Sequence, residues 1–236
     1  IVESETSLVI HNDEYETDVE VANSCETNWG GTSDFSKKLA KIVLENTQGL
    51  KIENVLDLNT DTGRLAFELA PHFDKITAID FSARFIRMPI QLQEKGFIRY
   101  ILKDEGELVF YRDILLSDFG LGENQENILF MQDNANNLKP IYSGYDLIVV
   151  PNLLEELICP ILFLKQIHER INQNGVLILA STYDWELNNI ERAHRPGGFK
   201  QDGEPVSSFE GIRSILSTHF NLVKEPENII QTLRKS

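Results

Sequence analysis

Short apolar runs alternate with helix-like segments along most of the chain, and this alternation constrains the fold more than any other feature of the sequence. Such an order of elements predicts an α/β fold with a mostly parallel sheet that carries helices on both faces. Buried strands are predicted at 54–58, 76–81, 128–132, 147–150 and 176–180, with a final strand at 229–233. Helices are predicted from residue 33 onward and at 64–70, 82–92, 153–171 and 210–219.

The length of 236 residues fits a single domain that spans the whole chain, 1–236. Residues 1–32 are polar and irregular, and we interpret them as an N-terminal lid or extension. The stretch 97–127 interrupts the alternation with two strand-like runs, which predicts a hairpin insertion. The polar, glycine-rich stretch 186–206 is expected to be a substrate-side loop. The first residue is Ile1 rather than Met, which is consistent with a piece cut from a longer polypeptide.

The charge balance narrows the range of partners. The chain has 37 acidic against 22 basic residues, a net charge of −15, so its surface repels phosphate backbones and anionic membranes. No apolar run reaches the ~18 residues that a membrane helix requires. The two cysteines, Cys25 and Cys159, are far apart and are expected to be reduced thiols in a cytoplasmic protein. The five histidines have no partners at metal-ligand spacing, so no metal site is expected.

Polar residues follow four of the predicted strands at the points where these strands end. The carboxyl ends of parallel strands meet at one edge of a wound sheet, and ligands bind there. The candidate binding residues are Asp57, Asn59 and Gly63 after the first strand, Asp80 and Phe81 after the second, Asp133 and Asn134 after the third, and Asn152 after the fourth.

These residue types match the chemistry of S-adenosylmethionine (SAM), which carries a sulfonium cation, an ammonium group, a ribose diol and an adenine amine. Asp80 can accept hydrogen bonds from the ribose hydroxyls. Asp133 can accept from the adenine amine while the backbone N–H of Asn134 serves a ring nitrogen. Asp57 can order the turn and interact with the ammonium group. We therefore predict a doubly wound, seven-stranded sheet of the class I SAM-methyltransferase (Rossmann-like) type.

The same residues allow two other interpretations. Each acid could instead cap a helix or face water, but acids that follow three consecutive strands favour SAM. A nicotinamide dinucleotide site would require several glycines that bring backbone amides against a pyrophosphate. Only Gly63 is present, and Asp57 and Asp61 would repel phosphate, so the dehydrogenase interpretation is disfavoured.

The chain also resembles a known family along most of its length. The most distinctive similar stretches are the run Asp80-Phe81-Ser82-Ala83-Arg84-Phe85-Ile86 and the loop Gly197-Gly198-Phe199. The other similar stretches are 15–17, 55–57, 63–64, 67–70, 92–93, 96, 99–100, 105–108, 144–147, 152–153, 183–185 and 203–205. In these residues the chain resembles the C-terminal methyltransferase domain of the ovothiol-biosynthesis enzyme, which is usually joined to an iron-dependent sulfoxide synthase.

The resemblance implies transfer of a methyl group from SAM to a ring nitrogen of 5-thiohistidine. It also implies a sulfoxide synthase, attached or separate, as a partner. By position, the candidates for contact with this acceptor are Tyr15, Asn152, Tyr183 and Trp185. A neutral imidazole nitrogen is already nucleophilic, so alignment with the methyl group should supply most of the rate. A nearby hydrogen-bond acceptor would select the productive tautomer.

The turn after the first strand departs from the family pattern. The family has Asp-x-Gly-Cys-x-x-Gly, whereas this chain has Asp57-Leu58-Asn59-Thr60-Asp61-Thr62-Gly63. Asn tolerates left-handed backbone geometry, so the turn is expected to survive, with the side chain of Asn59 occupying space beside the methionine part of SAM. The alternative is a degenerate methyltransferase-like domain without catalysis that acts as a binding or regulatory module.

Overall fold

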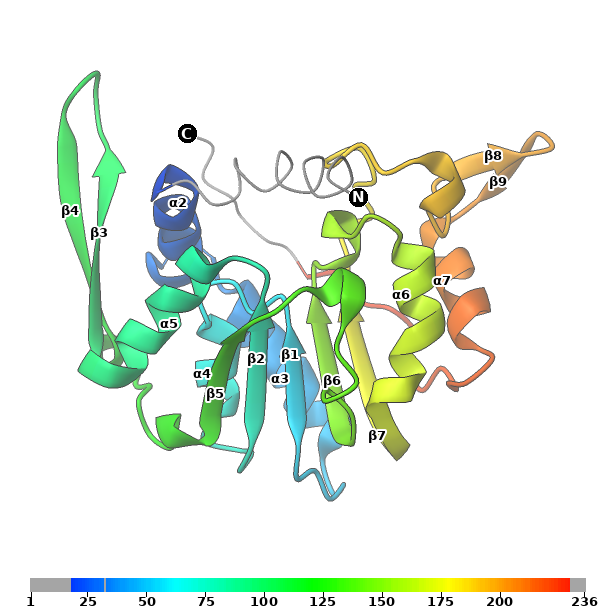
Figure 1. Ribbon diagram of the computed structural model, residues 1–236, viewed down its shortest axis with the longest axis horizontal. Coiled ribbons are helices and arrows are strands. Elements are labelled where there is room, and N and C mark those ends of the chain that lie inside the picture. The colour runs from blue at the N-terminus through cyan, green and yellow to red at the C-terminus, as the bar shows by residue number, and fades with distance from the viewer. Residues whose placement is uncertain (1–17, 32, 230–236) are drawn as a thin grey trace.

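The computed structural model describes residues 18–31 and 33–229 (Figure 1). Its α-helices are α2 (Asp18–Trp29), α3 (Phe35–Thr47), α4 (Arg64–Leu69), α5 (Ala83–Lys95), α6 (Pro160–Gln166) and α7 (Ser208–Leu216). Its strands are β1 (Val55–Leu58), β2 (Ile76–Asp80), β3 (Phe97–Lys103), β4 (Val109–Leu115), β5 (Ile128–Gln132), β6 (Tyr145–Pro151), β7 (Ile171–Ala180), β8 (Phe199–Gln201) and β9 (Glu204–Val206). Its 3₁₀ helices are η1 (Leu116–Phe119), η2 (Gln125–Asn127), η3 (Ala135–Asn137), η4 (Leu154–Glu156), η5 (Ile167–Arg170) and η6 (Arg192–His194).

The central sheet has the strand order β5-β2-β1-β6-β7, and every neighbouring pair is parallel. From β1 the chain builds outward to β2 and β5 and then returns to the other side of β1 with β6, so the order reverses between β1 and β6. The predicted doubly wound fold is confirmed. The described residues contribute five strands to this sheet rather than the seven expected. Of the predicted final strand, only Ile229 is described, and it lies outside any strand.

Alternate residues of the strands face two separate cores. Val55, Ala78 and Phe130 pack with α2 to α5 on one face. Leu56 and Ile148 pack with η4, α6 and α7 on the other. Because both faces are covered, all four residues of β1 are buried, which explains why the strands appear in the sequence as continuous apolar runs.

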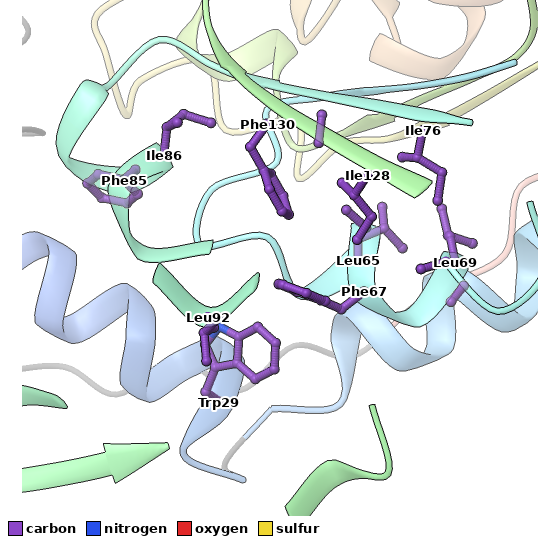
Figure 2. Close-up of a cluster of buried hydrophobic side chains, with 14 of the residues drawn as sticks. Trp29, Leu65, Phe67, Leu69, Ile76, Phe85, Ile86, Leu92, Ile128 and Phe130 are labelled. Carbon is purple, nitrogen blue, oxygen red and sulfur yellow. The ribbon is translucent and has the colours of Figure 1, made fainter. Parts of the chain in front are cut away.

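An aromatic cluster joins α2, α4 and β5 in the first core (Figure 2). The ring centroid of Phe67 lies 5.8 Å from that of Trp29 and 5.5 Å from that of Phe130. Edge-to-face and tilted rings at these separations favour close packing. Helix α2 is therefore anchored to the sheet through α4.

The hairpin predicted within 97–127 is present as the antiparallel pair β3 and β4, which projects away from the central sheet (Figure 1). Ile98, Tyr100 and Leu102 are buried on the face of β3 that lies toward the helices. Contacts of β3 with both α2 and α5 hold the hairpin against the domain.

Three further predicted segments differ from the structure. The stretch 186–206 was expected to be a loop, but it contains η6 and the antiparallel pair β8 and β9. Helix α2 occupies residues expected to be irregular, and its buried residues Val21, Cys25 and Trp29 recur every four positions on one face. The helix predicted at 153–171 is divided into η4, α6 and η5. Pro160 stands in the first turn of α6, where its missing N–H costs nothing, so a new helix begins there.

Candidate functional site

The turn after β1 has left-handed backbone geometry although Asn59 stands where the resembled family has glycine. Asn59 and Asp61 have φ angles of 71° and 54°, in the left-handed region, and Gly63 has a φ of 81°. The N–H groups of Asn59 and Thr60 both donate to the carbonyl of Ile79 in β2, at 2.9 and 3.0 Å. The expectation that the turn survives with Asn at position 59 is confirmed.

Gly63 also has a packing role where α4 begins. A Cβ atom at this position would lie 2.4 Å from Cβ of Pro89 in α5 and 3.0 Å from the ring of Phe130. Any side chain would therefore force α4 and α5 apart, in addition to straining the positive φ.

Asp57 is a fully buried carboxylate at the carboxyl end of β1. Its Oδ2 accepts a 2.6 Å hydrogen bond from Oγ1 of Thr60, whereas its Oδ1 is buried without a hydrogen-bond partner in the part of the chain that the structure describes. Burial raises the pKa of Asp57 to about 7; the bond from Thr60 opposes this rise and the charge of Asp61 adds to it. An unpaired oxygen of this kind is costly unless a ligand supplies a donor or a positive charge.

Asp80 ends β2 and is only 1% exposed. Its Oδ2 accepts from the N–H of Asp61, and its Oδ1 from the N–H of Ser82, both at 2.9 Å. A carboxylate has about four lone-pair positions, so these two bonds leave capacity for ligand hydroxyls. Burial, followed by the charge of Asp61, raises the pKa of Asp80 to about 7.

Helix α2 covers the turn and takes part in the site. The Ser24 hydroxyl and the Asn28 amide both donate to the carboxylate of Asp61, the latter at 2.9 Å. The indole N–H of Trp29 donates to the carbonyl of Thr62 at 3.2 Å. Burial raises the pKa of Asp61 to about 6, against the bonds from Ser24 and Asn28. None of these α2 residues was predicted from the sequence, because no pattern there indicated a helix.

The side chain of Asn59 links the turn after β1 to the segment after β6. Its Nδ2 lies 3.2 Å from both the carbonyl oxygen of Pro151 and Oε1 of Glu156. Part of the surface of Glu156 is exposed to solvent, but the surrounding protein atoms desolvate its carboxylate. This desolvation is the main cause that raises its pKa to about 8, and the charges of Asp80 and, more weakly, Asp61 add to it. Glu156 was not among the predicted site residues.

Asp133 takes a different position from the one expected. Its backbone N–H donates to the carbonyl of Asp80 at 2.9 Å, so the chain does pass beside the site. Its carboxylate, however, accepts from Nζ of Lys139 at 2.7 Å and from the Tyr142 hydroxyl and the Asn134 N–H at 2.8 Å. Burial would raise the pKa of Asp133, but these three bonds outweigh it and hold the pKa below its usual range. The structure therefore brings Asp57 and Asp80 together and turns the Asp133 side chain toward Lys139. Phe81, also predicted, accepts from Gln132 through its carbonyl.

The structure describes three of the four candidates for acceptor contact. Tyr15 lies outside the described residues. Asn152 has a φ of 50° at the end of β6, and its N–H donates to Ala180. Tyr183 has a φ of 60° after β7 and is 40% exposed. Trp185 is only 3% exposed, and its indole N–H donates to Ser208 at 2.8 Å, so it packs in the second core beneath Tyr183.

Glu155 holds the segment that carries Tyr183. Its Oε1 accepts from the Ser181 hydroxyl at 2.6 Å, the Thr182 hydroxyl at 3.1 Å and the Tyr183 N–H at 2.8 Å. Its Oε2 is buried without a hydrogen-bond partner in the described chain. The only signal in the sequence was a pair of adjacent acids shortly after the fourth predicted strand.

The structure also has cavities that are lined by other residues. A cavity of about 420 Å³ opens at the opposite, amino ends of the strands and is lined in part by Asn54, Lys75 and Asn127. A smaller cavity of about 200 Å³ lies beside Cys159 and Leu162. Over residues 18–31 and 33–229, no group of three or more side chains could hold a metal ion. Within the same residues, no helix is both long and apolar enough to span a bilayer.

Comparison with known proteins gives one match by sequence family. A family model described as a methyltransferase domain matches residues 32–224. A search of curated proteins found no match.

Solved structures with a similar fold share little sequence. The YcgJ protein from Bacillus subtilis is 12% identical with a TM-score of 0.49, over 75% of this chain and 67% of that protein. Coclaurine N-methyltransferase bound to N-methylheliamine and S-adenosylhomocysteine (SAH) is 19% identical with a TM-score of 0.44, over 61% of this chain and 35% of that one. The glycopeptide N-methyltransferase MtfA complexed with SAM is 14% identical with a TM-score of 0.45, over 63% and 55%. The chain thus spans less than two thirds of the length of two of these three proteins.

The residues at this edge fit the predicted cofactor. No ion pair among the described residues involves Asp57, Asp61, Asp80 or Glu156, so these acids lie close together without a neutralising cation. SAM carries two positive groups and a ribose diol, which are the partners that an unpaired Oδ1 of Asp57 and the free lone pairs of Asp80 require.

Proposed function

Because the chain belongs to the methyltransferase domain family, we propose that it is a SAM-dependent N-methyltransferase that acts on a ring nitrogen of a small thiohistidine-like molecule. One observation carries the cofactor part of this proposal. Asp57 and Asp80 are buried side by side at the carboxyl edge of the sheet, with raised pKa values and without a cationic partner among residues 18–31 and 33–229. A ligand with positive charge stabilises their ionised forms.

The proposed roles of the cofactor-binding residues follow from their positions. When bound, SAM supplies an activated methyl group on a sulfonium ion. The Asp80 carboxylate, fixed by two backbone N–H groups, accepts from the ribose hydroxyls. Asp57 faces the ammonium group through its unpaired Oδ1. The backbone around Asp133 and Asn134, which is hydrogen-bonded to Asp80, lies where the adenine edge is expected.

The thiohistidine acceptor rests on the family resemblance and on the positions of two residues. Asn152 and Tyr183 follow the carboxyl ends of the neighbouring strands β6 and β7, and the carbonyl oxygen of Asn152 lies 3.5 Å from Nδ2 of Asn59 in the turn that would hold the cofactor. An acceptor bound between these residues and the turn would be aligned with the methyl group, and alignment supplies most of the rate for a neutral imidazole. The buried Trp185 supports Tyr183 from below rather than contacting the acceptor itself.

The same proposal includes a source for the substrate. A sulfoxide synthase, attached or separate, would supply the sulfur-substituted histidine. We place the activity in the cytoplasm, since Cys25 and Cys159 are both free thiols.

Mass spectrometry tests the proposal. The protein is incubated with SAM and 5-thiohistidine, and the expected product has gained one methyl mass on the imidazole. The matched control is Asp80→Asn, which keeps the size of the side chain but removes the charge that the cofactor requires. Formation of SAH without a methylated imidazole would support methyltransferase activity but reject 5-thiohistidine as the acceptor.

A second candidate function is a methyltransferase-like binding module without catalysis. The observation that favours it is the turn itself, where Asn59 stands in place of a glycine of the resembled family and Asp61 adds a charge, and both side chains form hydrogen bonds to neighbouring elements. These side chains occupy space close to the expected methionine moiety. Titration calorimetry with SAM separates the two functions, because a module that has lost the cofactor gives no heat at high micromolar SAM.

A further inference from the structure

Two adjacent glutamates after β6 have opposite environments. Glu155 is 1% exposed and is bonded to residues 181–183. Glu156, the next residue in η4, is exposed and is hydrogen-bonded to Asn59 in the turn after β1. The first glutamate therefore fixes the end of β7, whereas the second faces the turn proposed to hold the cofactor.

The position of the Glu156 carboxylate is set by Asn59. Nδ2 of Asn59 bridges Oε1 of Glu156 and the carbonyl oxygen of Pro151, each at 3.2 Å. Asn59 occupies a position where the resembled family has glycine, and a glycine could not make either bond. The substitution in the motif thus gives this chain an amide that holds a carboxylate between the ends of β1 and β6.

The charges around Glu156 restrict what can bind beside it. Asp80, Asp61 and Glu155 are the charged groups that act on it, and all three are acids. Their combined field repels anionic acceptors such as carboxylates and phosphates, and it favours an acceptor that offers an N–H. A cation bound beside Asp57 and Asp80 lowers the pKa of Glu156 and leaves its carboxylate free to accept a hydrogen bond.

We propose that Glu156 is the residue that binds the methyl acceptor by an N–H, selects nitrogen heterocycles of the imidazole class, and takes up the proton that the acceptor releases. This inference rests on the proposed methyltransferase function and specifies the acceptor side of the same site. By accepting from one ring N–H, Glu156 fixes the tautomer in which the other ring nitrogen presents its lone pair.

The chemical step balances with this assignment. The lone pair of the second ring nitrogen forms the new N–C bond, and the C–S bond breaks with its electron pair on sulfur, which becomes a neutral thioether. The ring is then a cationic N-methylimidazolium, and its remaining N–H proton passes to the carboxylate of Glu156.

The test uses imidazole as the probe and Glu156→Gln as the variant. SAH affinity is first measured by calorimetry for the wild type, Glu156→Gln and Glu45→Gln, which removes an exposed acid on α3. Imidazole is then titrated into each SAH-saturated protein and followed by NMR. We expect SAH affinity within about twofold in all three proteins, and an imidazole dissociation constant at least tenfold higher in Glu156→Gln alone.

A second variant tests the role of Asn59. In Asn59→Gly the carboxylate loses its amide partner, so imidazole binding should weaken by a smaller factor, and the Asn59→Gly change should have no further effect in the Glu156→Gln background. Equal imidazole affinity in the wild type and Glu156→Gln, or no imidazole binding to the wild type, overturns the inference. Failure of the wild type to bind SAH instead rejects the proposed function, and the two results are read from separate titrations.

Discussion

The backbone N–H of Asp61 donates a 2.9 Å hydrogen bond to Oδ2 of Asp80, and this bond joins the turn after β1 to the end of β2. Asp61 adopts a left-handed conformation, with a φ of 54°. The same residue receives hydrogen bonds from Ser24 and Asn28 through its side chain. One residue of the turn therefore connects α2, β1 and β2 at the proposed cofactor site.

Two substitutions of Asp80 should distinguish its contribution to SAM binding from its contribution to the stability of the fold. Asp80 is 1% exposed and accepts two backbone hydrogen bonds. Asp80→Ala should therefore lose about 1–3 kcal/mol of stability as well as cofactor affinity. Asp80→Asn keeps an acceptor and should remain folded while its SAM affinity falls at least tenfold. Calorimetry and thermal melts of both variants check this, and normal SAM binding by Asp80→Asn would show that the site is misplaced.

Asn59→Gly should tighten SAM binding a few-fold, because it removes side-chain bulk beside the methionine moiety while glycine adopts the same φ of 71° without strain. The matched control is Asn124→Gly, which makes the same change at a φ of 55° outside the site. Calorimetric SAM affinities of the two variants provide the measurement. Weaker binding in Asn59→Gly would mean that the Asn59 side chain supports the cofactor rather than crowding it.

The stability of the free protein should fall as pH rises from about 5 to 8. The pKa values of Asp57 and Asp80 are about 7 in the folded chain and near 3.9 when unfolded, so the folded state holds more protons between these values. The stabilisation is therefore complete below about pH 4 and is lost as pH rises through 7. The raised pKa of each carboxyl corresponds to a change of at most about 4 kcal/mol in the free energy of unfolding. For Asp57 we expect a loss of about 2 kcal/mol of stability. Denaturation at several pH values should show a smaller loss of stability in Asp57→Asn than in the wild type, because only the contribution of Asp80 remains in the variant. The same loss of stability in both proteins would contradict the prediction.

The contact between α2 and the hairpin should contribute more to stability than the ion pair on the outer face of the hairpin. The buried carboxylate of Glu26 accepts from the Tyr100 hydroxyl at 2.7 Å and from Arg112 at 3.0 Å. Glu26→Ala leaves these groups unpaired and should cost about 3 kcal/mol. Asp113→Asn breaks the exposed pair with Arg99 and should cost less than about 1 kcal/mol. Urea unfolding of both variants tests the difference. Equal losses of stability would contradict the claim that the contact between α2 and the hairpin stabilises the protein more than the exposed ion pair does.

The parts of the site that could be predicted from the sequence are those fixed by strand order alone. Asp57 and Asp80 follow apolar runs, and parallel strands necessarily bring such residues to one edge. Helix α2 was missed because its apolar residues recur only every fourth position among Ser, Asn and Thr, which are weak helix formers. The orientation of the Asp133 carboxylate depends on Lys139 and Tyr142, and their positions follow from a loop conformation that no periodicity encodes.

Glu156 illustrates the same limit at the acceptor side. Its partner Asn59 lies 97 residues away in sequence, and the two meet only because β1 and β6 are neighbours in the sheet. The sequence shows an Asn in place of a glycine and two adjacent acids, and neither feature alone indicates that they form a hydrogen bond.

Calorimetric titration with SAM at neutral pH tests the central claim most directly. The account predicts saturable binding of one SAM per chain, unchanged in Glu45→Gln and lost or weakened at least tenfold in Asp80→Asn. It also predicts a binding heat that depends on the ionisation enthalpy of the buffer, since a cation that binds beside Asp57 and Asp80 displaces their protons. No heat at high micromolar SAM would contradict the account.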